Sequence, residues 1–157
     1  MAHKLPWQVL AAGEGIEGGY DRDIHRLGKI SSSELGAWMG SASIYVLPAK
    51  YEPFGLSVLE AGLCGAALVL GDIPSFRELW GDYALYVDPD DTEQLEDTLQ
   101  MLIHKPWLRR EYGERARQNA LRYSVSRMID SYMELYKYLI SRKKEYRKDE
   151  GKNLLCA

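Results

Sequence analysis

Residues 44–70 read IYVLPAKYEPFGLSVLEAGLCGAALVL, and this stretch decides the fold. It opens and closes with short apolar runs, at 44–47 and 67–70, that are typical of buried strands. Between them, residues 55–65 are apolar on nearly every side, as a buried helix is. Two buried strands joined by a helix predict parallel pairing, because parallel strands need a long crossover connection.

The same alternation continues on both sides of this stretch. Further strand-like runs lie at 7–12, 24–27 and 85–87. Helical patterns occupy residues 31–41, 74–80, 106–122 and 126–144, and a further one follows Asp91. The first begins with a capping box of Ser31 and Glu34, and the one after Asp91 begins with a cap formed by Asp91 and Gln94. Alternating strands and helices predict an α/β fold with a Rossmann-like, doubly wound parallel sheet, closed by C-terminal helices.

The length of 157 residues is that of one domain, which we expect to span residues 1–141. Residues 142–157 are polar and charged, and we expect them to fray and then to be disordered. The basic residues of this tail alternate with acids, so we interpret it as solvated. A weak peripheral contact with anionic lipid is the alternative.

The overall composition argues against several classes of protein. A net charge of −3 gives no electrostatic reason to expect a nucleic-acid partner. No apolar run is long enough to span a bilayer, and residues 1–10 lack the apolar core of a signal peptide. Cys64 and Cys156 have no metal-ligand spacing, so we expect reduced thiols and a cytoplasmic location.

Two carboxylates, Glu52 and Glu60, flank the predicted start of the central helix. If the helix begins near Gly55, its first free N–H groups form an anion site, and a glycine lets the backbone approach the anion closely. Carboxylates repel phosphate but accept strongly from hydroxyl groups. The pattern therefore predicts a nucleotide sugar. On spacing alone, a dipole-favoured loop carboxylate and a solvated helical glutamate are an equally good interpretation.

Six motifs in order resemble those of retaining glycosyltransferases with the GT-B fold, most closely family 4. Glu52 and Glu60 match the E-x7-E motif of those enzymes. The other motifs are residues 12–15 (AGEG), 27–35 (LGKISSSEL), 42–48 (ASIYVLP), 71–74 (GDIP) with Glu78, and 84–91 (ALYVDPDD). The likeness covers residues 7–140 and corresponds to the C-terminal, donor-binding domain. That domain's first strand and its Arg/Lys pair, which usually neutralises the diphosphate, are not found here.

The resemblance implies roles for individual residues. Glu52 would be the catalytic residue, holding hydroxyl groups of the donor sugar near its reacting carbon, and Glu60 would hold the ribose hydroxyls. The main chain around Lys29 and Ile30 would read the base. Backbone N–H groups that cradle the sugar and the distal phosphate would come from Phe54, Gly55, Leu56 and Ser57, with the Ser57 hydroxyl as an extra donor.

The implied activity is transfer of a sugar from a nucleoside-diphosphate sugar to an unknown acceptor. The acceptor pocket of such enzymes lies in an N-terminal domain that this chain does not match, so we expect the chain to be inactive alone and to bind donor weakly or undetectably. Two alternatives stay open. One is a non-catalytic or split-enzyme binding module that needs a separate acceptor-domain partner, and the other is a nucleotide-sugar epimerase or phosphorylase of related fold.

Three further patterns are weak. Residues 13–18 spell G-x-G-x-x-G, but no helical pattern follows as a dinucleotide site requires. Residues 21–23 and 88–90 both spell D-x-D, and we interpret them as a polar loop and a strand end before a helix cap, so no metal or other cofactor is expected. Lys50 and Arg77 could lie near a diphosphate, but an ordinary surface role is at least as good an interpretation.

Overall fold

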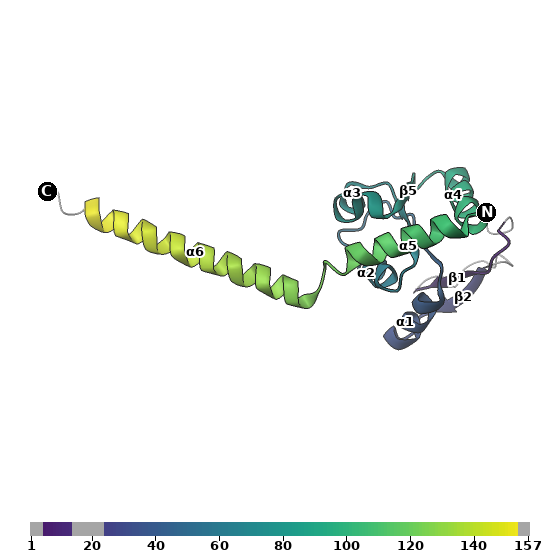
Figure 1. The fold of residues 1–157 in the computed structure, drawn as a ribbon, viewed down its shortest axis with the longest axis horizontal. Coiled ribbons are helices and arrows are strands. Elements are labelled where there is room, and N and C mark those ends of the chain that lie inside the picture. Colours follow the sequence, from purple (N-terminus) through teal and green to yellow (C-terminus); the bar gives the residue numbers. More distant parts are fainter. Residues whose placement is uncertain (1–4, 14–23, 154–157) are drawn as a thin grey trace. The chain divides into compact units, whose positions relative to one another are not determined.

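The computed structural model describes residues 5–13 and 24–153, and of residues 144–153 it describes the backbone only. The chain forms two compact units, Met1–Leu121 and Arg122–Ala157. The first unit alternates strands and helices as the sequence predicts, and the second is built on one long helix (Figure 1).

The elements of the first unit have bounds close to those predicted. Its strands are β1 (Val9–Ala12), β2 (Ile24–Gly28), β3 (Ile44–Leu47), β4 (Ala67–Gly71) and β5 (Leu85–Val87). Its helices are α1 (Ser32–Ser41), α2 (Leu56–Leu63), α3 (Pro74–Trp80), α4 (Thr92–His104) and α5 (Pro106–Ala120), with a short 3₁₀ turn at Gly81–Tyr83. The predicted capping box is confirmed, because the Ser31 hydroxyl accepts from the Glu34 N–H and the Glu34 carboxylate accepts from the Ser31 N–H.

All strand pairs are parallel, but they form two sheets where the sequence predicts one. One sheet has the order β1-β2 and the other the order β3-β4-β5. A doubly wound sheet of order 3-2-1-4-5-6 places its first strand between two such groups. Within the described residues, no strand fills that place. The α/β class with parallel strands is confirmed, and the strands lie in two sheets.

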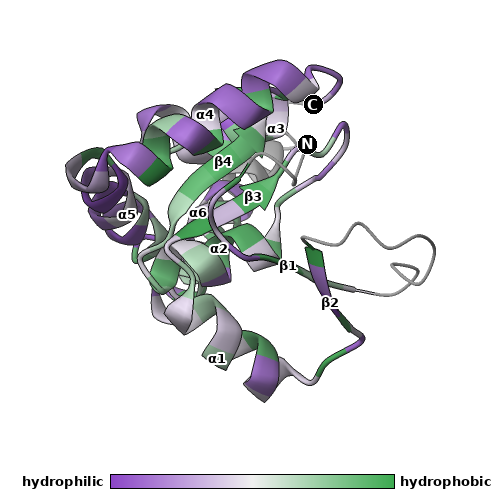
Figure 2. Ribbon diagram, turned by 90° about the vertical axis from the view of Figure 1, so that its right-hand side faces the viewer, coloured by the Kyte–Doolittle hydropathy of each residue, from purple (hydrophilic) through white to green (hydrophobic). Residues whose placement is uncertain are grey.

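Strand β4 is the centre of the core, and all five of its residues are buried. Leu68 and Leu70 pack in one cluster with Phe76 of α3 and with α2. Ala67 and Val69 point to the opposite face, into a cluster with α4. Because helices cover both faces, the strand is a continuous apolar run rather than an alternating one. Figure 2 shows β3 and β4 as largely hydrophobic and much of α4 and α5 as hydrophilic.

The second unit contains α6 (Val125–Asn153), whose side chains at 125–143 are all exposed. The sequence predicts a helix that ends near residue 144 and a disordered tail from 142, whereas α6 continues through 142–153. Lysine, arginine and glutamate dominate this segment and are good helix formers, so no local signal stops the helix before Asn153. None of the described helices is long and apolar enough to cross a membrane.

Candidate functional site

Gly55 makes the turn at which α2 begins. It is the N-cap residue of α2, with φ 79° and ψ 67°, a left-handed conformation that favours glycine. A Cβ at this position would lie 2.9 Å from Val58 Cγ2 and 3.1 Å from Phe76 Cε1, both in the core. Glycine therefore lets the helix begin close to the core, beyond the carboxyl end of β3, where ligands bind in sheets of this kind.

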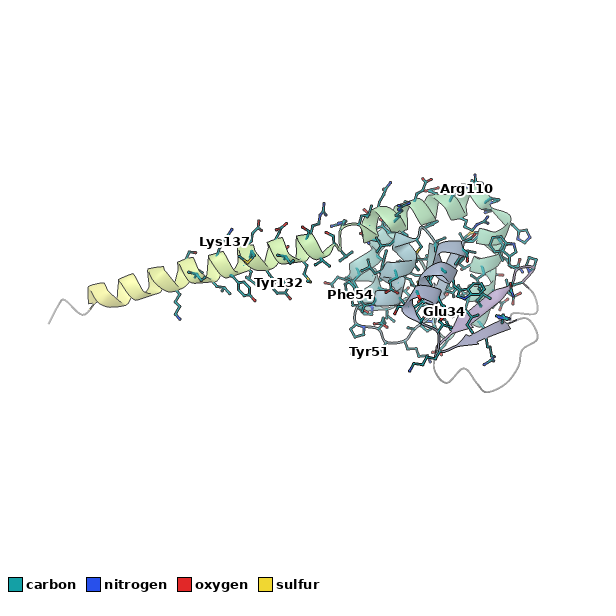
Figure 3. The ribbon with its side chains drawn as sticks, turned by 90° about the horizontal axis from the view of Figure 1, so that it is seen from below. Glu34, Tyr51, Phe54, Arg110, Tyr132 and Lys137 are labelled. Carbon is teal, nitrogen blue, oxygen red and sulfur yellow. The ribbon has the colours of Figure 1, made fainter. Side chains whose placement is uncertain are left out.

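The Glu52 carboxylate accepts from the last two N–H groups before α2, and we call this contact the Glu52 cap. Its Oε1 accepts the N–H of Gly55 at 3.0 Å and that of Phe54 at 3.4 Å. The hydroxyl of Ser75, in the first turn of α3, donates to the Glu52 carbonyl at 2.6 Å. Glu52 lies in the loop that follows β3. Its side chain is fixed by the N–H groups before α2, and its main chain is fixed by the start of α3. Figure 3 shows Phe54 and Tyr51, which belong to the same loop.

The cap changes which N–H groups are open to an anion. The sequence predicts that Phe54, Gly55, Leu56 and Ser57 all offer N–H groups to a phosphate, but the first two already bond to Glu52 in this structure. Leu56 and Ser57 occupy the first turn of α2, where N–H groups have no acceptor within the helix. An anion that also uses the N–H groups of Phe54 and Gly55 must displace the Glu52 carboxylate.

Sequence reasoning missed Tyr45, a half-buried residue of β3 that bonds to the first turn of α2. Its hydroxyl donates to Ser57 Oγ at 2.8 Å. Burial raises the pKa of the Tyr45 phenol, the bond to Ser57 lowers it, and the charges of Glu52 and Glu60 raise it further. One sequence signal could have identified it: alternation along β3 places Tyr45 and Leu47 on the face that packs against the α2 cluster.

Glu60 lies on the exposed surface of α2, three residues after Ser57 and therefore on the same face of the helix. Its charge reaches Tyr45, as that of Glu52 does. Glu52 thus bonds to Gly55, Tyr45 bonds to Ser57, and the charges of Glu52 and Glu60 both act on Tyr45.

Lys29 and Ile30 belong to a different segment from these residues. They form the connection from β2, in the two-stranded sheet, to α1. Lys29 is exposed and Ile30 is half-buried. Met39 of α1 packs in the same core cluster as α2. The connection at Lys29 and Ile30 and the start of α2 therefore adjoin two helices that share one core.

Both candidate cations have carboxylate partners. Arg77 donates from Nε and Nη2 to the two carboxylate oxygens of Asp72, at 2.7 and 2.8 Å, and its guanidinium lies 3.9 Å from the centre of the Tyr86 ring. The hydrogen bond from Arg77 lowers the pKa of Asp72. Lys50 forms an ion pair with Asp90. These partners favour the surface interpretation of both residues.

The D-x-D pattern at 88–90 is a helix entry. Asp88 Oδ1 accepts the N–H of Asp90 at 2.9 Å, and Asp91 caps α4 by accepting the Gln94 N–H at 2.9 Å. In the part of the chain that the structure describes, no group of three or more histidine, cysteine, aspartate or glutamate side chains could hold a metal ion. The patterns at 14–18 and 21–23 lie outside the described residues.

Known proteins resemble this chain over much of its length. Residues 17–119 match the family model of glycosyl transferases group 1. O-antigen chain mannosyltransferase B of Escherichia coli is 33% identical over 102 residues, which cover 64% of this chain and 26% of the relative. Phosphatidyl-myo-inositol mannosyltransferase of Mycobacterium leprae is 30% identical over 139 residues, covering 82% of this chain and 37% of the relative. The matched segments therefore span a quarter to little more than a third of these relatives.

Solved structures show the same fold. Anabaena HepE, crystallised with UDP-glucose, superimposes with a TM-score of 0.75 at 18% identity, over 87% of this chain and 43% of HepE. The C-terminal domain of LpcC, a glycosyl transferase group 1 family protein of Francisella tularensis, superimposes with a TM-score of 0.59 at 27% identity, over 66% of this chain and 54% of that one. These neighbours place the first unit in the α/β fold of GT-B glycosyltransferases.

Proposed function

The chain belongs to the glycosyl transferases group 1 family, and from this premise we propose that it is the donor-binding part of a retaining, family 4 glycosyltransferase. One observation carries the proposal: α2 begins at Gly55 with Glu52 and Glu60 on either side, inside the segment that matches the family. The substrate class is a nucleoside-diphosphate sugar. Relatives named as mannosyltransferases and a neighbour crystallised with UDP-glucose support this class.

In the proposed complex, the distal phosphate of the donor docks at the first turn of α2. The N–H groups of Leu56 and Ser57 donate to its oxygens, and the positive end of the helix favours its charge. As the bond between sugar and diphosphate breaks, negative charge grows on the leaving diphosphate. Preorganised N–H donors stabilise that charge more in the transition state than in the ground state, which lowers the barrier. The mechanism assigns this role to backbone groups rather than to a metal ion.

The two glutamates hold hydroxyl groups. Glu60, on the exposed face of α2, accepts from the ribose, while main-chain atoms near Lys29 and Ile30 contact the base. Glu52 leaves the N–H groups of Phe54 and Gly55 to the donor and accepts from the donor sugar. We propose front-side attack of the acceptor on the same face of the sugar, with a covalent intermediate on Glu52 as the alternative.

The acceptor pocket belongs, in our proposal, to another domain or to a partner chain. The relatives are roughly three to four times as long as the segments that match them, which leaves room for a second domain. Two relatives are named for lipid-containing molecules, phosphatidyl-myo-inositol and diphospho-undecaprenol, so a lipid-linked acceptor would bring the enzyme to a membrane surface. Without the acceptor domain we expect weak donor binding and no transfer.

A nuclear magnetic resonance titration tests the proposal. The ¹⁵N-labelled chain is titrated with UDP, GDP and ADP, each up to tens of millimolar, and with the free nucleosides as phosphate-free controls. We expect at least one diphosphate to shift the amide signals of Gly55, Leu56 and Ser57 more than its nucleoside does. Shifts confined to other parts of the chain, or no shift with any diphosphate, would overturn the proposal.

A further inference from the structure

The hydrogen bond between Tyr45 and Ser57 has no part in the function described so far. It joins β3 to the first turn of α2, at the second residue of the helix. Tyr45 is half-buried and packs against the same core cluster as α2. The phenol ring is therefore held by packing, and its hydroxyl bonds to the side chain of Ser57, one of the two residues whose N–H groups the proposed function assigns to a phosphate.

The number of protons that the two hydroxyls can donate determines the acceptor to which each one points. A tyrosine or serine hydroxyl has one proton to donate and can also accept. Tyr45 gives its proton to Ser57 Oγ, so Ser57 must direct its own proton to a different acceptor. The raised pKa of Tyr45 keeps the phenol protonated, and hence a donor, throughout the neutral range.

The nearest carboxylate on the same helix face is that of Glu60, three residues further along. Within the described chain, Ser57 and Glu60 form no side-chain hydrogen bond, and the bond from Tyr45 is the one present at Ser57 Oγ. The serine proton is thus available to an acceptor placed at the helix start. A phosphate oxygen bound by the N–H groups of Leu56 and Ser57 is such an acceptor.

Resting on the proposed function, we propose that Tyr45 is a positioning residue of the donor site: its hydroxyl orients the Ser57 hydroxyl so that Ser57 donates to the distal phosphate of the donor. Tyr45 itself touches neither phosphate nor sugar. It acts through Ser57, and its contribution disappears when the Ser57 hydroxyl is removed.

A double-mutant cycle tests this dependence. Binding of UDP is measured for the unaltered chain, Tyr45→Phe, Ser57→Ala and the double variant, by the amide titration described above. UDP is replaced by GDP or ADP if one of those shifts Gly55 most. Tyr45→Phe keeps the packed ring and removes the hydroxyl. We expect it to weaken diphosphate binding about three- to tenfold, the usual range for one hydrogen bond. In the Ser57→Ala background the same change should have no further effect.

Tyr86→Phe is the matched control. Tyr86 is another half-buried tyrosine on a strand, and its hydroxyl donates to the carbonyls of Phe76 and Gly81 rather than to α2. Its loss should leave diphosphate binding unchanged. Ser57→Thr keeps a hydroxyl at the position and should retain most of the response to Tyr45→Phe.

The outcomes separate the inference from the function on which it rests. If no diphosphate binds the unaltered chain near Gly55, the proposed function fails, and the role of Tyr45 fails with it. If the unaltered chain binds but Tyr45→Phe binds equally well, only the inference is overturned. The inference is also overturned if Tyr45→Phe weakens diphosphate binding equally in the presence and in the absence of the Ser57 hydroxyl. That result would show that Tyr45 supports the fold and does not act through Ser57.

Discussion

Replacing Gly55 with alanine should destabilise the first unit much more than replacing Gly65 with alanine. The two glycines have nearly the same backbone conformation, with φ of 79° and 81°. The left-handed region costs an L-residue about 1 to 2 kcal/mol, and the reduced freedom of the unfolded chain returns roughly 0.4 to 1 kcal/mol. These two contributions are common to both substitutions, so each variant should lose on the order of 1 kcal/mol from the backbone alone.

Packing distinguishes the two positions. An alanine Cβ at Gly65 would have no heavy atom within 4 Å, whereas at Gly55 it would lie 2.9 Å from Val58 Cγ2 and 3.1 Å from Phe76 Cε1. Val58 and Phe76 are fully buried, so neither can move aside without disturbing the core. Overpacking of this kind costs typically about 1 to 3 kcal/mol. We therefore expect Gly55→Ala to cost about 2 to 4 kcal/mol in total.

Urea unfolding measures the difference. Both variants and the unaltered chain are unfolded under identical conditions, with the fluorescence of buried Trp80 among the signals that report the first unit, and free energies come from linear extrapolation. Gly55→Ala should fall below Gly65→Ala by about 1 to 3 kcal/mol. Equal midpoints for the two variants would refute the argument that Gly55 is required by its contacts with Val58 and Phe76.

Three further predictions concern single groups. Glu52→Gln should strengthen the binding of a diphosphate that carries no sugar, because it removes the negative charge that competes for the N–H groups of Phe54 and Gly55, and it should slow sugar transfer in the intact enzyme; weaker diphosphate binding would contradict the cap. Burial raises the pKa of Tyr86 to about 12, from 10.0, so its contribution to stability is complete below pH 10 and is lost as the pH rises through 12. The phenolate absorbance that disappears in Tyr86→Phe should accordingly titrate near 12 and not near 10. Arg77 lowers the pKa of Asp72, so the stability that Asp72 contributes is present above its ordinary pKa of 3.8 and is lost as the pH falls below it; Asp72→Asn and the unaltered chain should converge in acid unfolding curves.

Local signals were sufficient to predict most of the elements. Strands such as 44–47 and 85–87 are short apolar runs between turn residues, and the caps at Ser31 and Asp91 depend only on side chains three residues apart. The start of α2 at Gly55 follows from the same local chemistry. Each of these features is set within a few residues of the chain, which is why it can be read from the sequence.

The features that the sequence did not predict depend on segments distant along the chain. The break between the two sheets is a matter of which strands meet, and no local pattern of residues sets which strands pair. The Tyr45 to Ser57 bond joins residues twelve apart, on a strand and a helix. The Glu52 cap was missed for a different reason: the same N–H groups can take either a side-chain carboxylate or a bound phosphate, and the sequence is identical in both cases.

The central claim is that a nucleoside diphosphate docks where α2 begins, and a crystal structure of the chain soaked with a saturating diphosphate tests it most directly. The account predicts phosphate oxygens within hydrogen-bond distance of the N–H groups of Leu56 and Ser57, with Glu60 toward the ribose and the Glu52 carboxylate withdrawn from Gly55. A diphosphate bound elsewhere on the chain, with Glu52 still capping Gly55, would contradict it.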